Sequence, residues 1–180
     1  MSIGSRTVLV IGVLAFTLAV GCGKKNEPAA KTSETTSGAA VPAPPPLPPG
    51  MSTHLKRNPG APFYNFDSLG PINFPAVQKS NQISAEAAVG ITGWAADPSK
   101  QFLAGGVDVV IDGIPYSARY GTDRTDVAKH YDKPEFAKSG FQLLLAPRQL
   151  TKGAHGVAIR VITHDQKSYN EGPLVPFMVN

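Results

Sequence analysis

Cysteine is almost absent from this chain, which has one, Cys22, among 180 residues. A single cysteine excludes an intramolecular disulfide, so the chain is not a disulfide-stapled secreted domain. Long apolar runs are also missing. The longest covers residues 8–20 and is interrupted by Gly12 and Thr17, whereas a membrane-spanning helix needs about 20 apolar residues. The run therefore has the length of the apolar centre of a signal peptide.

A charge excess is absent from the C-terminal two thirds of the chain. Residues 61–180 contain eleven basic and eleven acidic side chains, and the basic surplus of the whole sequence lies in residues 1–60, six against two. Nucleic-acid binding requires a basic patch on a folded face. Because the composition provides no such excess, we expect no nucleic-acid partner.

Sequence motifs for catalysis and cofactor binding are missing as well. The histidines show no zinc-ligand spacing, and the aspartates match no calcium-loop spacing. The sequence has no Gly-x-Ser-x-Gly elbow and no phosphate-binding glycine loop. Asp108 and Asp112 lie four residues apart on one face of a predicted strand, and we interpret them as part of a solvated face. We therefore expect a non-catalytic protein without a metal or cofactor.

The N-terminal 22 residues follow the order of a signal peptide that ends at a cysteine. Arg6 precedes the apolar run, the small residues Ala19 to Gly21 follow it, and Cys22 comes next. This series resembles the lipobox of bacterial lipoproteins. The resemblance implies cleavage after Gly21, lipid attachment to Cys22 and, through this lipid, an anchor in the membrane. By resemblance to sorted lipoproteins of Gram-negative bacteria, Gly23 favours the outer membrane over the inner one.

Residues 22–60 have almost no apolar periodicity. Residues 29–40 are small and hydroxyl-rich, and residues 41–49 are dense in proline. Such stretches bury too little surface to offset their ordering entropy, and the proline-rich part is typical of a semi-rigid spacer. The domain division predicted here is a signal peptide over residues 1–21, a disordered tether over residues 22–60 and a folded domain over residues 61–180.

Residues 61–180 show short alternating apolar runs that are separated by turn residues. Asp112-Gly113 between two such runs is a strong hairpin signal. About seven strands at roughly ten-residue spacing predict an all-β, antiparallel sandwich. The predicted strands cover residues 63–66, 88–96, 107–111, 114–120, 141–145, 157–162 and 174–179, and the run near residue 83 is a candidate for a further one. Between them, Pro134 and Gly140 indicate a short two-helix excursion over residues 126–138.

Five short motifs follow one another in the predicted domain. They are Gly93-Trp94-Ala95-Ala96-Asp97, the hairpin Asp112-Gly113, Arg124-Thr125-Asp126-Val127-Ala128, Ser139-Gly140-Phe141 and Leu150-Thr151-Lys152-Gly153-Ala154-His155. In this order they resemble the immunoglobulin-like modules that many bacterial exported and surface-polysaccharide-associated proteins carry. The resemblance covers nearly all of residues 63–180. It implies an accessory β-sandwich with no catalytic residues to carry over.

Three aromatic residues are candidate ligand contacts, because an aromatic face can stack on a sugar ring: Trp94, Tyr116 and Tyr120. The position of Trp94 in the middle of a strand favours a core indole that packs between the two sheets. Tyr116 and Tyr120 share a predicted strand face with Ile114, which favours the core or its edge. Buried rings would leave a protein-interaction module as the interpretation, whereas two coplanar exposed rings would favour glycan binding.

Arg124 stands just before the predicted excursion. A guanidinium that binds a carboxylate with two parallel hydrogen bonds can lock a loop in place, so we expect Arg124 to pair with Asp97 or Asp126. The whole pattern favours a lipid-anchored envelope protein whose sandwich is a protein-interaction or assembly module. The alternative is a glycan-binding module at the cell envelope, motivated by Trp94, Tyr131 and the two strand tyrosines.

Overall fold

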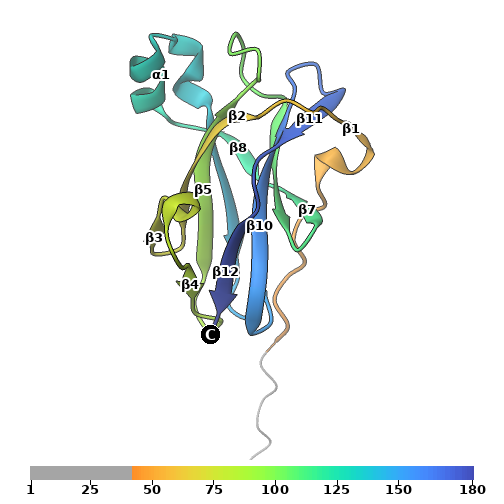
Figure 1. The fold of residues 1–180 in the computed structure, drawn as a ribbon, viewed down its shortest axis with the longest axis vertical. Helices are drawn as coiled ribbons and strands as arrows, with labels where there is room; N and C mark the ends of the chain where they lie inside the picture. Colours follow the sequence, from red (N-terminus) through yellow and green to blue (C-terminus); the bar gives the residue numbers. More distant parts are fainter. Residues whose placement is uncertain (1–41) are drawn as a thin grey trace, which may run out of the picture. The chain divides into compact units, whose positions relative to one another are not determined.

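The computed structural model describes residues 42–180, which form two facing β-sheets (Figure 1). The all-β prediction is confirmed at the level of a two-sheet sandwich. Sheet A has seven strands: β1 (Lys56–Arg57), β4 (Gln82–Ile83), β6 (Gly106–Ile111), β7 (Ile114–Ser117), β10 (Gly153–Ile162), β11 (Ser168–Glu171) and β12 (Val175–Val179). Sheet B has five: β2 (Phe63–Leu69), β3 (Ile72–Asn73), β5 (Val89–Ala96), β8 (Arg119–Thr122) and β9 (Gly140–Leu145).

The strand order explains which strands are central. In sheet A the long β10 pairs with β6 on one side and with β12 and β11 on the other. In sheet B the order is β3-β2-β5-β9-β8. Most pairs are antiparallel, as predicted, but the short edge pairs β1–β11 and β12–β4 are parallel.

The main hydrophobic core lies between the sheets and comes from alternate residues of the central strands. In β5 these are Val89, Ile91 and Ala95, and matching alternate residues of β9 and β10 complete the core. The other residues of β5 face outward from the sandwich. This alternation places Trp94, between Ala95 and Gly93, on the outer face of sheet B.

The predicted hairpin is present, and its turn has the expected backbone. Asp112 and Gly113, with φ of 50° and 84°, connect β6 to β7, and positive φ at both positions suits a two-residue hairpin turn. The prediction of one strand over residues 114–120 is wrong. The chain breaks at Ala118, whose N–H donates to the carbonyl of Val107, and passes from β7 in sheet A to β8 in sheet B.

The predicted end of the tether at Gly60 is also wrong. Residues 47–58, which we call the strap, lie against the domain and are coloured orange in Figure 1. The Gly50 N–H donates to the Pro115 carbonyl at 3.0 Å, and the Ser117 N–H donates to the Pro48 carbonyl at 3.1 Å. These bonds cover the free edge of β7. A proline-rich segment has few amides of its own, but its carbonyls still accept from a neighbouring strand.

Asp108 shows why the strap is ordered. Its carboxylate is fully buried and accepts from the N–H groups of Met51, at 3.0 Å, and Ser52, at 2.6 Å. These two amides begin the 3₁₀ helix η1 (Met51–His54), whose first N–H groups have no partner within the helix. The interpretation of Asp108 as part of a solvated face is therefore wrong, because the strap covers the outer face of sheet A at this point.

The two-helix excursion is present close to its predicted bounds. It consists of α1 (Thr125–Tyr131) and the 3₁₀ helix η3 (Pro134–Lys138), and a further 3₁₀ turn, η2 (Pro75–Val77), follows β3. Pro134 lies in the first turn of η3, where its missing N–H costs no hydrogen bond. None of the helices in residues 42–180 is long and apolar enough to cross a membrane.

His155 on β10 is held by acceptors at both ring nitrogens. Nδ1 lies 2.6 Å from an Asp112 carboxylate oxygen, and Nε2 lies 2.8 Å from the Thr151 carbonyl oxygen. Only the protonated imidazole donates from both nitrogens. Partial burial alone lowers the pKa of His155, but the hydrogen bonds to Asp112 and Thr151 outweigh it, so this pKa lies above its ordinary value.

This arrangement predicts a pH-dependent contribution to stability. The raised pKa of His155 means that its protonated form stabilises the fold fully below the unfolded-state pKa of about 6.5, and that this stabilisation is lost as pH rises through the folded-state value. We expect the difference in melting temperature between the parent and His155→Gln to be largest near pH 6 and to shrink toward pH 9. An equal difference at both pH values would contradict the doubly bonded imidazolium.

Candidate functional site

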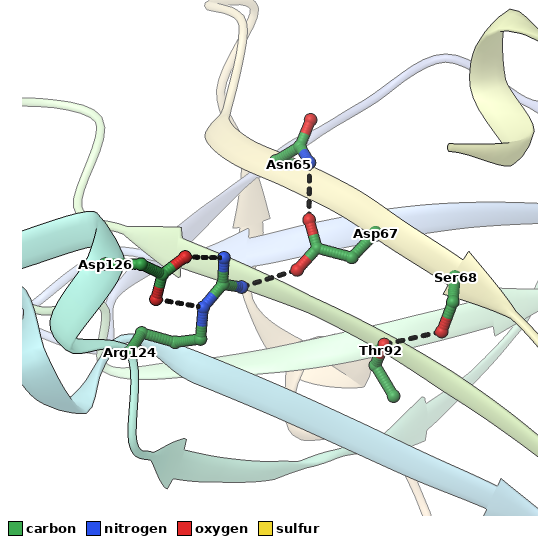
Figure 2. A network of polar contacts seen from close by, with 6 residues as sticks. All are labelled: Asn65, Asp67, Ser68, Thr92, Arg124 and Asp126. Atoms are coloured by element: carbon green, nitrogen blue, oxygen red, sulfur yellow. Dashed lines mark hydrogen bonds and ion pairs between the residues drawn. The ribbon is translucent and has the colours of Figure 1, made fainter. Parts of the chain in front are cut away.

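The most connected polar cluster on the outer face of sheet B is centred on Arg124, directly before α1 (Figure 2). Its Nε and Nη2 donate to the two carboxylate oxygens of Asp126 at 2.9 and 2.7 Å, and its Nη1 donates to Asp67 on β2. The other Asp67 oxygen accepts from Asn65 Nδ2. We call Asn65, Asp67, Arg124 and Asp126 the arginine cluster.

Asp67, which pairs with Arg124, lies at a β-bulge of β2. Along β2, Phe66 lies opposite Gly93 and Ser68 lies opposite Thr92, so Asp67 is an extra residue without a partner on β5. Asp67 shares the outer face of sheet B with Asn65, two residues before it, and the bulge changes the alternation only from Ser68 onward. Sequence analysis missed Asp67 because no local pattern shows which strand lies beside Arg124.

Gly140 on β9 leaves room for the arginine side chain. A Cβ at this position would lie 3.0 Å from the Arg124 Cγ and 2.9 Å from the Thr122 carbonyl oxygen. Both separations are too short for a side chain to be accepted without movement. Gly140, which follows the excursion, therefore also lets Arg124 lie close to the sheet.

The cluster carries one net negative charge, because two carboxylates surround one guanidinium. The hydrogen bonds from Arg124 are the largest influence on Asp126 and lower its pKa to about 2. The same hydrogen bonds raise the pKa of Arg124. Asp126 is mostly exposed, whereas the side chains of Arg124 and Asp67 are 20% and 27% exposed, so the Arg124–Asp67 pair is the better shielded one.

Of the two predicted partners of Arg124, the structure brings Asp126 to it but not Asp97. The Asp97 carboxylate accepts instead from the backbone N–H groups of Ser99, at 2.8 Å, and His164, at 2.6 Å. It therefore closes the loop after β5 against the loop after β10. The alternative of an Arg124–Asp97 pair is wrong because each Asp97 carboxylate oxygen accepts from one of these two amides instead.

Trp94 is buried, with 7% of its surface exposed, but it does not pack between the sheets as predicted. It belongs to a second apolar cluster between the outer face of sheet B and the excursion, which contains Val127 and Phe136. Its ring lies 5.1 Å from that of Phe63 and 5.4 Å from that of Tyr131, in edge-on arrangements. The excursion covers this face, which a bare sandwich would leave to solvent.

The other predicted aromatic contacts lie elsewhere. Tyr120 packs on the main core, where its hydroxyl donates to the Ala95 carbonyl at 2.7 Å and accepts from the Ala104 N–H at 3.1 Å. Burial raises the pKa of Tyr120 to about 12. Tyr116 packs on the same core and pairs with Pro49 of the strap. The structure therefore does not bring Tyr116 and Tyr120 together with Trp94, and Cys22 and Gly21 lie outside the described residues.

Two clefts meet at β2 beside the arginine cluster. The larger, of about 460 Å³, is lined by residues of α1 together with Tyr64, Asn65, Trp94 and Arg124. The smaller, of about 280 Å³, extends from Tyr64 and Asn65 to Phe74 and Val77 beside η2. Because Tyr64 and Asn65 line both clefts, the clefts adjoin at these two residues. We call this pair of adjoining clefts the β2 groove.

No family model, curated protein or solved structure matches this chain. The function is therefore argued from the chemistry of the β2 groove. Within residues 42–180, no three His, Cys, Asp or Glu side chains gather as the ligands of a metal ion would.

A double-mutant cycle would measure how the arginine cluster holds the excursion. We expect Arg124 and Asp67 to show a coupling energy of about 1 kcal/mol, since both are largely shielded from solvent. The coupling of Arg124 with the exposed Asp126 should be about half of that or less. The measurement is urea unfolding of the single and double alanine variants. A coupling near zero for both pairs would mean that the apolar cluster alone holds the excursion.

Proposed function

We propose that this chain is a lipid-anchored, non-catalytic protein of the bacterial cell envelope whose sandwich is a protein-interaction or assembly module. The observation that carries the interaction role is the β2 groove, which has a charged cluster at one end and exposed apolar side chains at the other. Phe74 and Val77, at that apolar end, are 55% and 79% exposed. An apolar surface beside fixed polar groups is typical of a site that binds a partner.

The finer identity of the domain is part of the proposal. Two facing sheets and a chain that crosses from one to the other at Ala118 support an immunoglobulin-like module. In this proposal Cys22 carries the lipid in the outer membrane. The residues between Cys22 and the strap then form the tether, which is shorter than the sequence pattern predicted.

Fractionation tests the anchor. Cys22→Ser should abolish labelling by a fatty-acid analogue and move the protein from the membrane to the soluble fraction. In the parent, density separation should place the protein with the outer membrane. If Cys22→Ser stayed in the membrane fraction, the lipid anchor would be wrong.

Site-specific photo-crosslinking in living cells tests the interaction role. A photoreactive residue in place of Asp126, beside the β2 groove, should give a discrete adduct with a protein. The matched control is the same residue in place of Ile114, which is 56% exposed on β7 of the other sheet. Adducts of equal yield from both positions, or from neither, would contradict a specific interaction surface at the groove.

Glycan binding remains the second candidate, and one observation favours it. The larger cleft combines Asn65, Arg124 and Asp126 with the half-exposed ring of Tyr131. However, the ring of Trp94 is inclined by 61° to that of Tyr131 and is almost entirely covered, so the two rings form no flat stacking platform. If envelope polysaccharide protected tryptophan emission from acrylamide quenching, glycan binding would replace protein binding as the better proposal.

A further inference from the structure

We propose that the partner of the β2 groove is an extended peptide segment of another protein, which adds to sheet B as a strand along the open edge of β2. This inference rests on the proposed function and names the class of partner. In such binding, main-chain hydrogen bonds hold the peptide, and alternate side chains provide specificity.

The register of sheet B shows which backbone groups point to the open edge. The Ala95 N–H donates to the Ser139 carbonyl on the β9 side, so the polar groups of Ala95 point away from β2. Tyr64 lies opposite Ala95. In an antiparallel ladder, residues of such a non-hydrogen-bonded pair direct their N–H and C=O groups outward. The backbone groups of Tyr64 therefore face the open edge, and two residues further on so do those of Phe66.

These groups have no strand partner among residues 42–180. The short strand β3 pairs only with Ser68 and Leu69 of β2. The Asp67 carbonyl accepts from the Phe74 N–H at 2.7 Å, and no other backbone hydrogen bond outside the β2–β5 ladder reaches residues 63–67. Tyr64 and Phe66 thus offer two donors and two acceptors at the spacing that an added strand requires.

The covered edge of β7 and the open edge of β2 differ in a way that supports a binding role for β2. The outer edge of β7 is covered by the strap through the bonds at Gly50 and Ser117. Open edges are templates for pairing, and proteins commonly blunt them. Along β2, by contrast, the β2 groove leaves room beside Tyr64 and Asn65 in both of its clefts.

Charge and polarity specify the peptide. Successive side chains of an added strand point to opposite faces of the sheet. On the outer face they would lie beside Asn65 and the net negative arginine cluster, which favours lysine or arginine. On the other face they would lie beside Tyr64 and Phe66, and toward η2 beside the exposed Phe74 and Val77, which favours apolar side chains. The fitting segment therefore alternates basic and apolar residues.

Amide hydrogen exchange of the full-length chain, followed by NMR, tests this inference. In the free protein the Asn65 amide, which faces β5, should exchange slowly, and those of Tyr64 and Phe66 should exchange fast. The peptide acetyl-VKVKV-amide should slow the amides of Tyr64 and Phe66 by about tenfold or more. The same peptide with N-methylated backbone amides should leave them unchanged.

A charge-reversal variant tests the specificity. Asp126→Lys should weaken the binding of acetyl-VKVKV-amide about tenfold and favour acetyl-VEVEV-amide, since the local net charge changes sign. The matched control is Glu86→Lys, which changes a carboxylate that is 59% exposed and paired with Arg148 on another surface. This control should leave both affinities as they are in the parent.

Three results would overturn the inference. Exchange at Tyr64 and Phe66 could be unaffected by the peptides. The two amides could already be slow in the free chain, which would mean that residues of the chain itself cover the edge. The amides of Tyr64 and Phe66 could also be protected in the concentrated free chain and exchange faster on dilution, which would identify a second copy of the chain as the occupant of the edge. In each case a crosslinked adduct at position 126 would leave the proposed function standing, so the two failures are distinguishable.

Discussion

Asp108→Ala is expected to lower the free energy of unfolding by about 3 kcal/mol or more, because it removes two hydrogen bonds to a fully buried carboxylate. The amides of Met51 and Ser52 would lose their acceptor, and η1 would lose the group that holds its first turn. This is a large fraction of the stability of a small domain. Urea unfolding monitored by far-ultraviolet circular dichroism would measure the loss.

The matched control for Asp108 is a surface carboxylate. Glu86 pairs with Arg148, and both side chains are about half exposed. Glu86→Ala should therefore change the free energy of unfolding by about 0.5 kcal/mol or less. If both variants lost the same amount, the contact between the strap and Asp108 would be unimportant for stability.

Deletion of the strap tests the contact with Asp108 by removing the amide donors in place of the carboxylate. A chain that begins at Ala61 leaves the Asp108 carboxylate without its two amide donors, and its stability should fall by at least as much as in Asp108→Ala. In that shortened chain the strap no longer covers Asp108, so the further change Asp108→Asn should alter the free energy of unfolding by about 0.5 kcal/mol or less, as for a surface residue. A further loss from Asp108→Asn would show that other groups hold the carboxylate.

Phe136→Ala is expected to lower the free energy of unfolding by about 3–5 kcal/mol, the range for deleting a fully buried phenylalanine. Phe136 anchors η3 in the second apolar cluster beside Trp94. Its loss should loosen the excursion as well as the sandwich. The emission of Trp94, the single tryptophan, should then move to longer wavelength and become accessible to acrylamide in the folded variant.

Leu144→Ala is the control for this change. Leu144 lies on β9, on the outer face of sheet B, and is 62% exposed. Its truncation should alter the free energy of unfolding by about 0.5 kcal/mol or less and leave the emission of Trp94 unchanged. A stable Phe136→Ala variant with unshifted emission would contradict the role of Phe136 as the anchor of the excursion.

The elements that sequence analysis predicted well are those controlled by local rules. The Asp112-Gly113 hairpin depends on two residues that accept positive φ. The excursion depends on Pro134 and on the break in strand periodicity, and the strands depend on alternation of apolar residues. The prediction of one strand over residues 114–120 was wrong, because the alternation of side chains continues while the chain passes from one sheet to the other. The pattern does not show that the partner strand changes.

The arginine cluster was predicted in part. Arg124 and Asp126 are two residues apart, and proximity in the sequence made their pairing foreseeable. Asp67 lies 57 residues away and meets Arg124 only because β2 and the residues before α1 come together on the outer face of sheet B. The β2 groove was not foreseeable either, since it depends on which strand forms the edge of sheet B.

The sequence alone determined the strand-rich fold class, the hairpin and the helical excursion, since each depends on composition or on residues close together in the chain. The lipid anchor stays a prediction from the same kind of local pattern. Only the tertiary structure decided the place of the strap, the burial of Asp108, the outward packing of Trp94 and the open edge of β2. Each of these depends on contacts between distant segments. Whether a proline-rich stretch is a tether or a strap is decided by whether another part of the fold presents a buried acceptor to its amides.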